Sequence, residues 1–72
     1  MPKEVKSAEE ATEIAELFLK KYRWLVRPLK AMRGDDVWTV EVDVGLIGVA
    51  VATVKIDAKT GAVQEYNIPS SS

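Results

Sequence analysis

Alternating apolar and polar side chains run through Val37-Trp38-Thr39-Val40-Glu41-Val42-Asp43-Val44. A period of two is typical of a β-strand with one buried face and one solvent face. The stretch therefore predicts a strand that decides the orientation of its neighbours. Its core-facing residues are Trp38, Val40, Val42 and Val44, and its outward residues are Thr39, Glu41 and Asp43.

A second strand is predicted over residues 49–57, where β-branched residues dominate. It returns antiparallel to the first strand in a register that keeps one face apolar, and a slip of one residue would move every side chain to the other face. The predicted pairs are Trp38 with Ile56, Val40 with Val54, Val42 with Ala52, Thr39 with Lys55 and Glu41 with Thr53.

A tight turn is predicted over residues 57–61, which read Asp-Ala-Lys-Thr-Gly. The Asp57 carboxylate can accept hydrogen bonds from the turn amides, and Gly61 can supply a positive φ. The last strand is then expected over residues 62–68, with Tyr66 and Ile68 facing inward.

An amphipathic helix is predicted over residues 7–25. Ser7 and Glu10 have the spacing of a capping box, and Pro28 disfavours helical geometry just before it, so we expect the helix to end near Trp24 or Leu25. Leu17 lies off the apolar stripe and is expected to be exposed. The stripe itself consists of Ala11, Ile14, Ala15, Phe18, Tyr22 and Leu25.

These elements predict the α+β class, with one N-terminal amphipathic helix (7–25) packed on an antiparallel meander of three or four strands. The strands are expected at 26–33, 37–44, 49–57 and 62–68. Whether residues 26–33 form a strand stays open, although an edge strand would tolerate Pro28. The chain is expected to be one domain, residues 1–72, with frayed ends at 1–6 and 69–72.

Composition narrows the function. The 72 residues are 47% hydrophobic and 29% charged, with a formal net charge of -1 and neither His nor Cys. Because these two residue types supply the commonest general base, metal ligands and nucleophile, we expect no enzyme and no cofactor. The acids Asp35, Asp36, Glu41 and Asp43 match no calcium loop, so no metal is expected either.

Location and stability are also expectations from composition. The longest apolar run, residues 44–52, is far shorter than the ~20 residues that span a bilayer, and the N-terminus lacks the apolar core of a secretory signal. We therefore expect no membrane partner and a cytoplasmic protein. Many charges with few Asn and Gln residues suit a thermostable protein.

The connection between the second and third strands is more apolar than a hairpin loop usually is. Leu46, Ile47, Val49 and Val51 are therefore candidate interaction residues, together with the outer face of the sheet, and the simplest protein partner is another copy of the chain. In the alternative interpretation, the loop folds over the end of the helix and completes the core. Both interpretations stay open.

A second candidate site is basic. Six of the ten basic residues lie between residues 20 and 33, with no acid among them, and Trp24 could offer a stacking face to an anion or a single-stranded nucleic acid. The structural explanation, a helix terminus followed by a charged edge strand, is favoured, and nucleic acid is not the expected partner. The basic residues are Lys20, Lys21, Arg23, Arg27, Lys30 and Arg33.

Three segments together resemble a PepSY-type domain: the Ala-rich helix, the strand Trp38-Thr39-Val40-Glu41-Val42 and the hairpin Val54-Lys55-Ile56-Asp57-Ala58-Lys59-Thr60-Gly61-Ala62-Val63. The resemblance covers residues 8–68 and implies a helix followed by an antiparallel sheet. PepSY-like domains are generally regarded as binding or inhibitory modules, often beside secreted proteases. The main prediction is therefore a non-catalytic protein-interaction module, and a PepSY-type inhibitory module is a further alternative.

Overall fold

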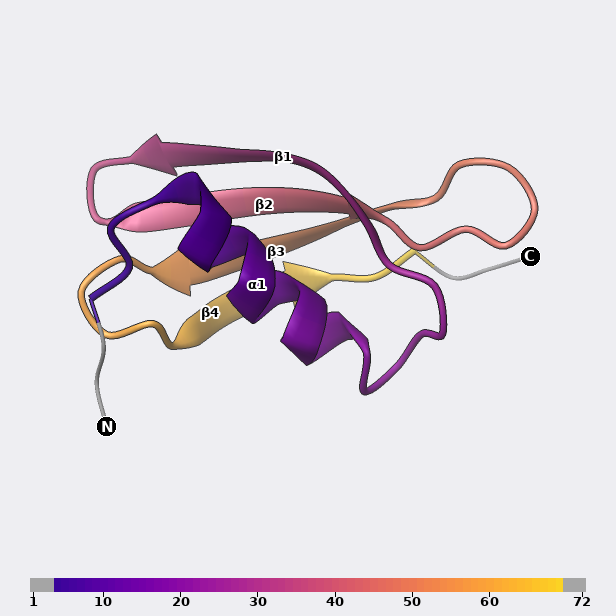
Figure 1. The fold of residues 1–72 in the computed structure, drawn as a ribbon, viewed down its shortest axis with the longest axis horizontal. Coiled ribbons are helices and arrows are strands. Elements are labelled where there is room, and N and C mark those ends of the chain that lie inside the picture. Colours follow the sequence, from indigo (N-terminus) through magenta and orange to yellow (C-terminus); the bar gives the residue numbers. More distant parts are fainter. Residues whose placement is uncertain (1–3, 70–72) are drawn as a thin grey trace.

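One helix lies across one face of a four-stranded antiparallel sheet (Figure 1). The computed structural model describes residues 4–69. The sheet order β1-β2-β3-β4 follows the chain, which confirms the predicted α+β meander and answers the question about residues 26–33 in favour of a strand. The elements are α1 (Ala8–Leu19), β1 (Arg27–Gly34), β2 (Val37–Asp43), β3 (Val51–Asp57) and β4 (Val63–Asn67).

The β2–β3 register is the predicted one, and it builds the centre of the core. Every predicted pair is present, including Trp38 with Ile56 and Val40 with Val54. These four side chains are buried, and each contributes roughly 1.5 to 3 kcal/mol relative to full exposure. The alternation in the sequence predicted this register because a slip of one residue would expose the apolar face.

The β3–β4 turn also follows the prediction. The amides of Lys59 and Thr60 donate to Asp57 Oδ1 at 2.7 and 3.3 Å, and Gly61 has a φ of 79°. The Gly61 amide donates to the Asp57 carbonyl at 2.8 Å. Local side-chain chemistry therefore sets the conformation of this turn, and the remote Asp36 carbonyl also holds it by accepting from the Ala58 amide at 2.7 Å.

The start of α1 is as predicted, but its end is not. Ser7 is the N-cap and its hydroxyl accepts from the Glu10 amide at 3.2 Å, whereas the Glu10 carboxylate accepts from the Lys6 amide at 2.7 Å. The predicted end near Trp24 or Leu25 is wrong, because α1 ends at Leu19. Lys20, Lys21 and Arg23 therefore follow the last helical residue.

A turn after Leu19 explains the early end of α1. The amides of Tyr22 and Arg23 both donate to the Leu19 carbonyl at 2.9 Å, and the chain then leaves toward the far edge of the sheet to form β1 (Figure 1).

Three core residues, Val5, Leu19 and Ala58, were missed by the sequence prediction. Leu19 is fully buried against the sheet, and Val5 is 1% exposed. The Val5 amide donates to the Ala58 carbonyl at 2.7 Å, and the Val5 carbonyl accepts from Trp38 Nε1 at 2.9 Å. The prediction of a frayed segment 1–6 is therefore wrong for Val5, while residues 1–3 and 70–72 lie outside the described residues.

Candidate functional site

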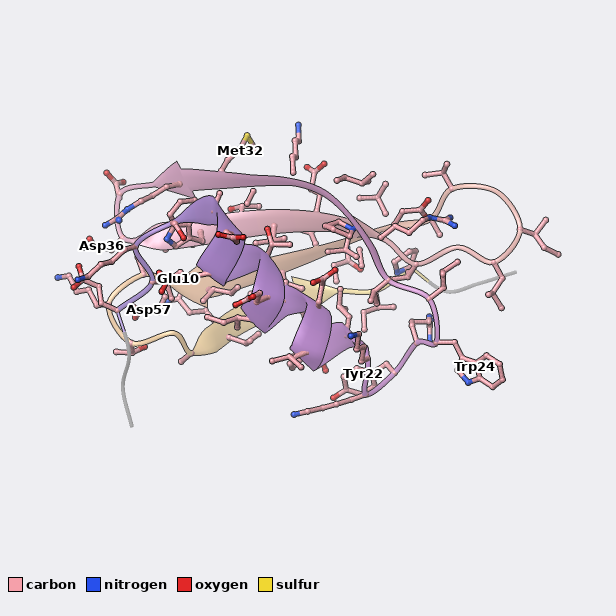
Figure 2. All side chains as sticks on the ribbon, in the orientation of Figure 1. Glu10, Tyr22, Trp24, Met32, Asp36 and Asp57 are labelled. Atoms are coloured by element: carbon pink, nitrogen blue, oxygen red, sulfur yellow. The ribbon has the colours of Figure 1, made fainter. Side chains whose placement is uncertain are left out.

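The two ends of the molecule differ in chemistry (Figure 2). One end carries the β1–β2 and β3–β4 turns, with Asp36 and Asp57. The opposite end carries the β2–β3 hairpin and the α1–β1 connection, from which Trp24 projects. The long axis of the molecule, 35 Å in extent, therefore separates a charged end from an apolar one.

The hairpin residues point into solvent. Leu46 is 78% exposed, Ile47 99%, Val49 76% and Val51 41%. The loop does not fold over the helix to complete the core, so this alternative is wrong. The outward side chains of the neighbouring strands are mostly polar, for example Glu41 and Lys55, so exposed apolar residues gather at the hairpin rather than across the outer sheet face.

Trp24 lies beside this hairpin rather than on a basic surface. It is 97% exposed, and it lines, with the hairpin, a groove of about 1050 Å³. We call the set Trp24, Leu46, Ile47, Val49 and Val51 the apolar pole. The other residues that line the groove are Tyr22, Arg23, Leu25, Val44, Gly45, Ala50 and Pro69. No local pattern links Trp24 to the hairpin, so the sequence alone did not reveal the groove.

Asp43 holds the base of the hairpin. Its Oδ1 accepts from the amides of Gly45 and Ala50 at 2.9 and 3.0 Å, and its Oδ2 accepts from Arg27 Nη2 at 2.8 Å. Asp43 was predicted to face solvent, yet it is only 5% exposed, because these donors enclose its carboxylate.

The same contacts set the acidity of Asp43. The amide hydrogen bonds from Gly45 and Ala50, followed by the Arg27 hydrogen bond, lower the pKa of Asp43 from 3.8 to about 2, although desolvation opposes the shift. The carboxylate is therefore charged at neutral pH, and its hydrogen bonds hold the two ends of the hairpin together.

Gly45 is expected to be intolerant of substitution. A Cβ at this position would overlap the backbone carbonyl oxygen of Gly48 and lie 2.9 Å from the Ala50 nitrogen. Gly45→Ala is therefore expected to lower the free energy of unfolding by about 1 to 3 kcal/mol and to shift the amide resonances of residues 44–50. Gly34→Ala, whose Cβ would meet nothing within 4 Å, is the matched control in urea unfolding. Equal losses in the two variants would contradict this account of the hairpin.

The predicted basic surface is divided by the fold. Arg27 pairs with Asp43, Lys30 Nζ lies 3.9 Å from Glu41 Oε1, and Arg33 Nη2 lies 3.9 Å from Asp36 Oδ1. The Arg23 guanidinium donates to the Pro69 carbonyl at 3.3 Å. Most of the predicted anion-binding cations therefore lie beside an acid or a carbonyl group, which weakens the field that an anion would meet.

The structure also bears on a metal site and on a membrane-spanning helix. Within residues 4–69, no three acidic side chains lie close enough together to hold a metal ion, because Asp36, Glu41 and Asp43 each face a basic partner. Over the same residues, no helix is long and apolar enough to cross a bilayer.

The elements and their order define a small α+β domain of the helix-on-meander type. The family model for PepSY, "Peptidase propeptide and YPEB domain", matches residues 5–67. Because the match spans nearly the whole chain, the protein belongs to the PepSY family, as the helix, central strand and hairpin predicted. The comparisons with curated proteins and with solved structures gave no match.

Proposed function

We propose that this PepSY domain is a non-catalytic protein-docking module that binds its partner through the apolar pole. One observation carries the proposal: the four most exposed large hydrophobic side chains of the described residues all line one groove. They are Trp24, Leu46, Ile47 and Val49. Contiguous apolar surface of this kind marks interaction sites, because leaving it in water is unfavourable.

The composition of the groove supports a protein partner. Interface cores are enriched in aromatic residues and Arg, and depleted of Lys, Asp and Glu. The groove lining includes Tyr22, Trp24 and Arg23, and it contains no Lys, Asp or Glu. The hairpin is also held at its base by Asp43, so binding would order little additional backbone.

A second copy of the chain is the simplest partner. The pole has a projecting hairpin and a groove beside it. In a dimer with a two-fold axis, the hairpin of each copy could therefore enter the groove of the other copy. A head-to-tail contact would instead press apolar side chains against the charged turns that hold Asp36 and Lys59, at a cost in desolvation.

Self-association predicts a simple result for Leu46→Ser combined with Ile47→Ser. The wild type is expected to sediment as a dimer at high concentration, and the double variant as a monomer. Because both side chains are exposed in the single chain, the free energy of unfolding measured at low concentration is expected to change by no more than about 0.5 kcal/mol. Leu17→Ser, which removes an exposed residue outside the groove, is the matched control and should leave the dimer intact.

The family's description favours a second candidate partner. It refers to peptidase propeptides, which supports a peptidase as the protein held at the same pole. A wild type that stays monomeric at every concentration would exclude the second copy and leave this candidate.

A photoreactive residue in place of Ile47, in the cells that make the protein, separates the two partners. An adduct of two copies supports the dimer, and an adduct with a peptidase supports the second candidate. The matched control carries the photoreactive residue in place of Thr60, which is exposed at the opposite end. Equal labelling at both positions, or no adduct at position 47, would contradict the apolar pole as the docking site.

A further inference from the structure

The two edges of the sheet differ in their protection against pairing with another chain. β1 contains Pro28, which lacks an amide donor, and its register with β2 shifts between Pro28 and Lys30. It also carries Lys30 and Arg33. Proline, irregular pairing and cations are the usual devices that block an edge strand, so the β1 edge is closed.

The β4 edge has neither proline nor a basic residue in Val63–Asn67. Gln64 is the extra residue of a bulge, and regular pairing with β3 runs from Glu65 to Asn67. Because β4 is the last strand of the sheet among the described residues, the backbone groups on its outer side have no strand partner there. Such an edge can hydrogen-bond to an added extended strand.

An aromatic cluster flanks this edge on the helix side of the sheet. The ring of Tyr66 lies 4.7 Å from the ring of Phe18 and 6.1 Å from that of Tyr22, centroid to centroid. Tyr66 and Tyr22 remain 50% and 49% exposed, although Tyr66 was predicted to face the core and Tyr22 to belong to the core stripe. The cluster therefore offers apolar surface to side chains of a strand placed next to β4.

The opposite face of the same edge is acidic. Glu65 lies next to Tyr66 in the strand and so points to the other face. Its side chain is 71% exposed, and Lys55 Nζ lies 3.9 Å from its Oε1, at the limit of an ion pair. A second cation arriving beside Glu65 would meet an incompletely neutralised carboxylate.

We propose that the β4 edge binds an extended segment of a partner polypeptide as a fifth strand, with apolar residues facing Tyr66 and alternate basic residues facing Glu65. This site is built on β4, which contributes no residue to the apolar pole, although Tyr22 lines both the groove and the aromatic cluster; the proposal does not depend on the function proposed for the pole. A second copy fits the edge less well, since pairing two β4 strands about a two-fold axis at Glu65 sets like charges opposite each other.

The test is a titration of the isotope-labelled protein with a short capped peptide that alternates lysine and valine. The amide resonances of Glu65, Tyr66 and Asn67 are expected to shift saturably. A peptide that alternates glutamate and valine should bind about 3-fold to 10-fold more weakly, and Glu65→Lys should reverse this preference. Lys30→Glu, at the closed β1 edge, is the matched protein control and should leave the preference unchanged.

Main-chain pairing is tested with the lysine-valine peptide methylated on every backbone nitrogen, which removes the amide donors of both of its edges. Loss of its binding supports strand addition, and undiminished binding overturns it. The proposal is also overturned if no β4 amide shifts, or if the shifts are confined to Trp24 and residues 44–51, since the peptide would then bind only at the apolar pole.

Discussion

Replacing Leu19 with alanine is expected to lower the free energy of unfolding by about 2 to 5 kcal/mol. Leu19 is fully buried, and truncation removes its transfer free energy and leaves a cavity that the two-layer core can only partly fill. A domain of this length has a total stability of about 4 to 11 kcal/mol. The single substitution is therefore expected to leave a marginally folded protein.

Urea unfolding measures this loss. Tryptophan fluorescence reports the transition, because Trp38 is buried in the folded protein. Leu17→Ala is the matched control, because it makes the same chemical change two residues earlier at a side chain that is 67% exposed. We expect the control to change the free energy of unfolding by no more than about 0.5 kcal/mol. Similar losses at both positions would contradict the placement of Leu19 in the core.

Replacing Asp43 with asparagine is expected to destabilise the protein at neutral pH and to remove part of its acid sensitivity. An asparagine side chain has only one acceptor oxygen for the three donors that surround Asp43, namely the Gly45 and Ala50 amides and Arg27. The asparagine oxygen can still accept from both amides, but the nitrogen that replaces Oδ2 is a donor and cannot accept from Arg27, and the charge that strengthens the amide hydrogen bonds is lost. The loss is expected to concentrate at the hairpin and to weaken every contact made by the apolar pole.

The pH dependence follows from the direction of the shift. The pKa of Asp43 falls from 3.8 to about 2 in the folded protein, so the unfolded chain binds a proton more readily than the folded one in this range. The stabilisation is therefore complete above about pH 4 and is lost as the pH falls through about 2.

Urea midpoints measured from neutral pH down to about pH 2 check this prediction. The gap between the wild type and Asp43→Asn should narrow steadily below about pH 4. Asp35→Asn is the matched control, because Asp35 is exposed in the β1–β2 turn at a φ of 55°, which asparagine tolerates. If the difference in urea midpoint between the wild type and Asp43→Asn stays constant over the whole pH range, the charge of Asp43 does not stabilise the hairpin.

The central part of the fold was determined by the sequence itself. In the strand that contains Trp38 and Val40, side chains alternate between two faces, so the sequence itself determines which face packs in the core, and a slip of one residue against β3 would expose that face. The conformation of the next turn is also set locally, because Asp57 accepts from the turn amides and Gly61 supplies the positive φ. The sequence left open whether residues 26–33 form a strand, but Pro28, which lacks an amide donor, is compatible with a strand at the edge of a sheet, where β1 lies.

Tertiary structure alone decided which residues share the binding surface. The apolar spacing of the helix continues past Leu19, but a turn closed by the Leu19 carbonyl ends the helix there. Trp24 then lines the same groove as Leu46 and Ile47. Val5 is anchored by groups from Trp38 and Ala58, which are remote in sequence. Burial depends on what the fold places next to a side chain, and no local pattern contains that information.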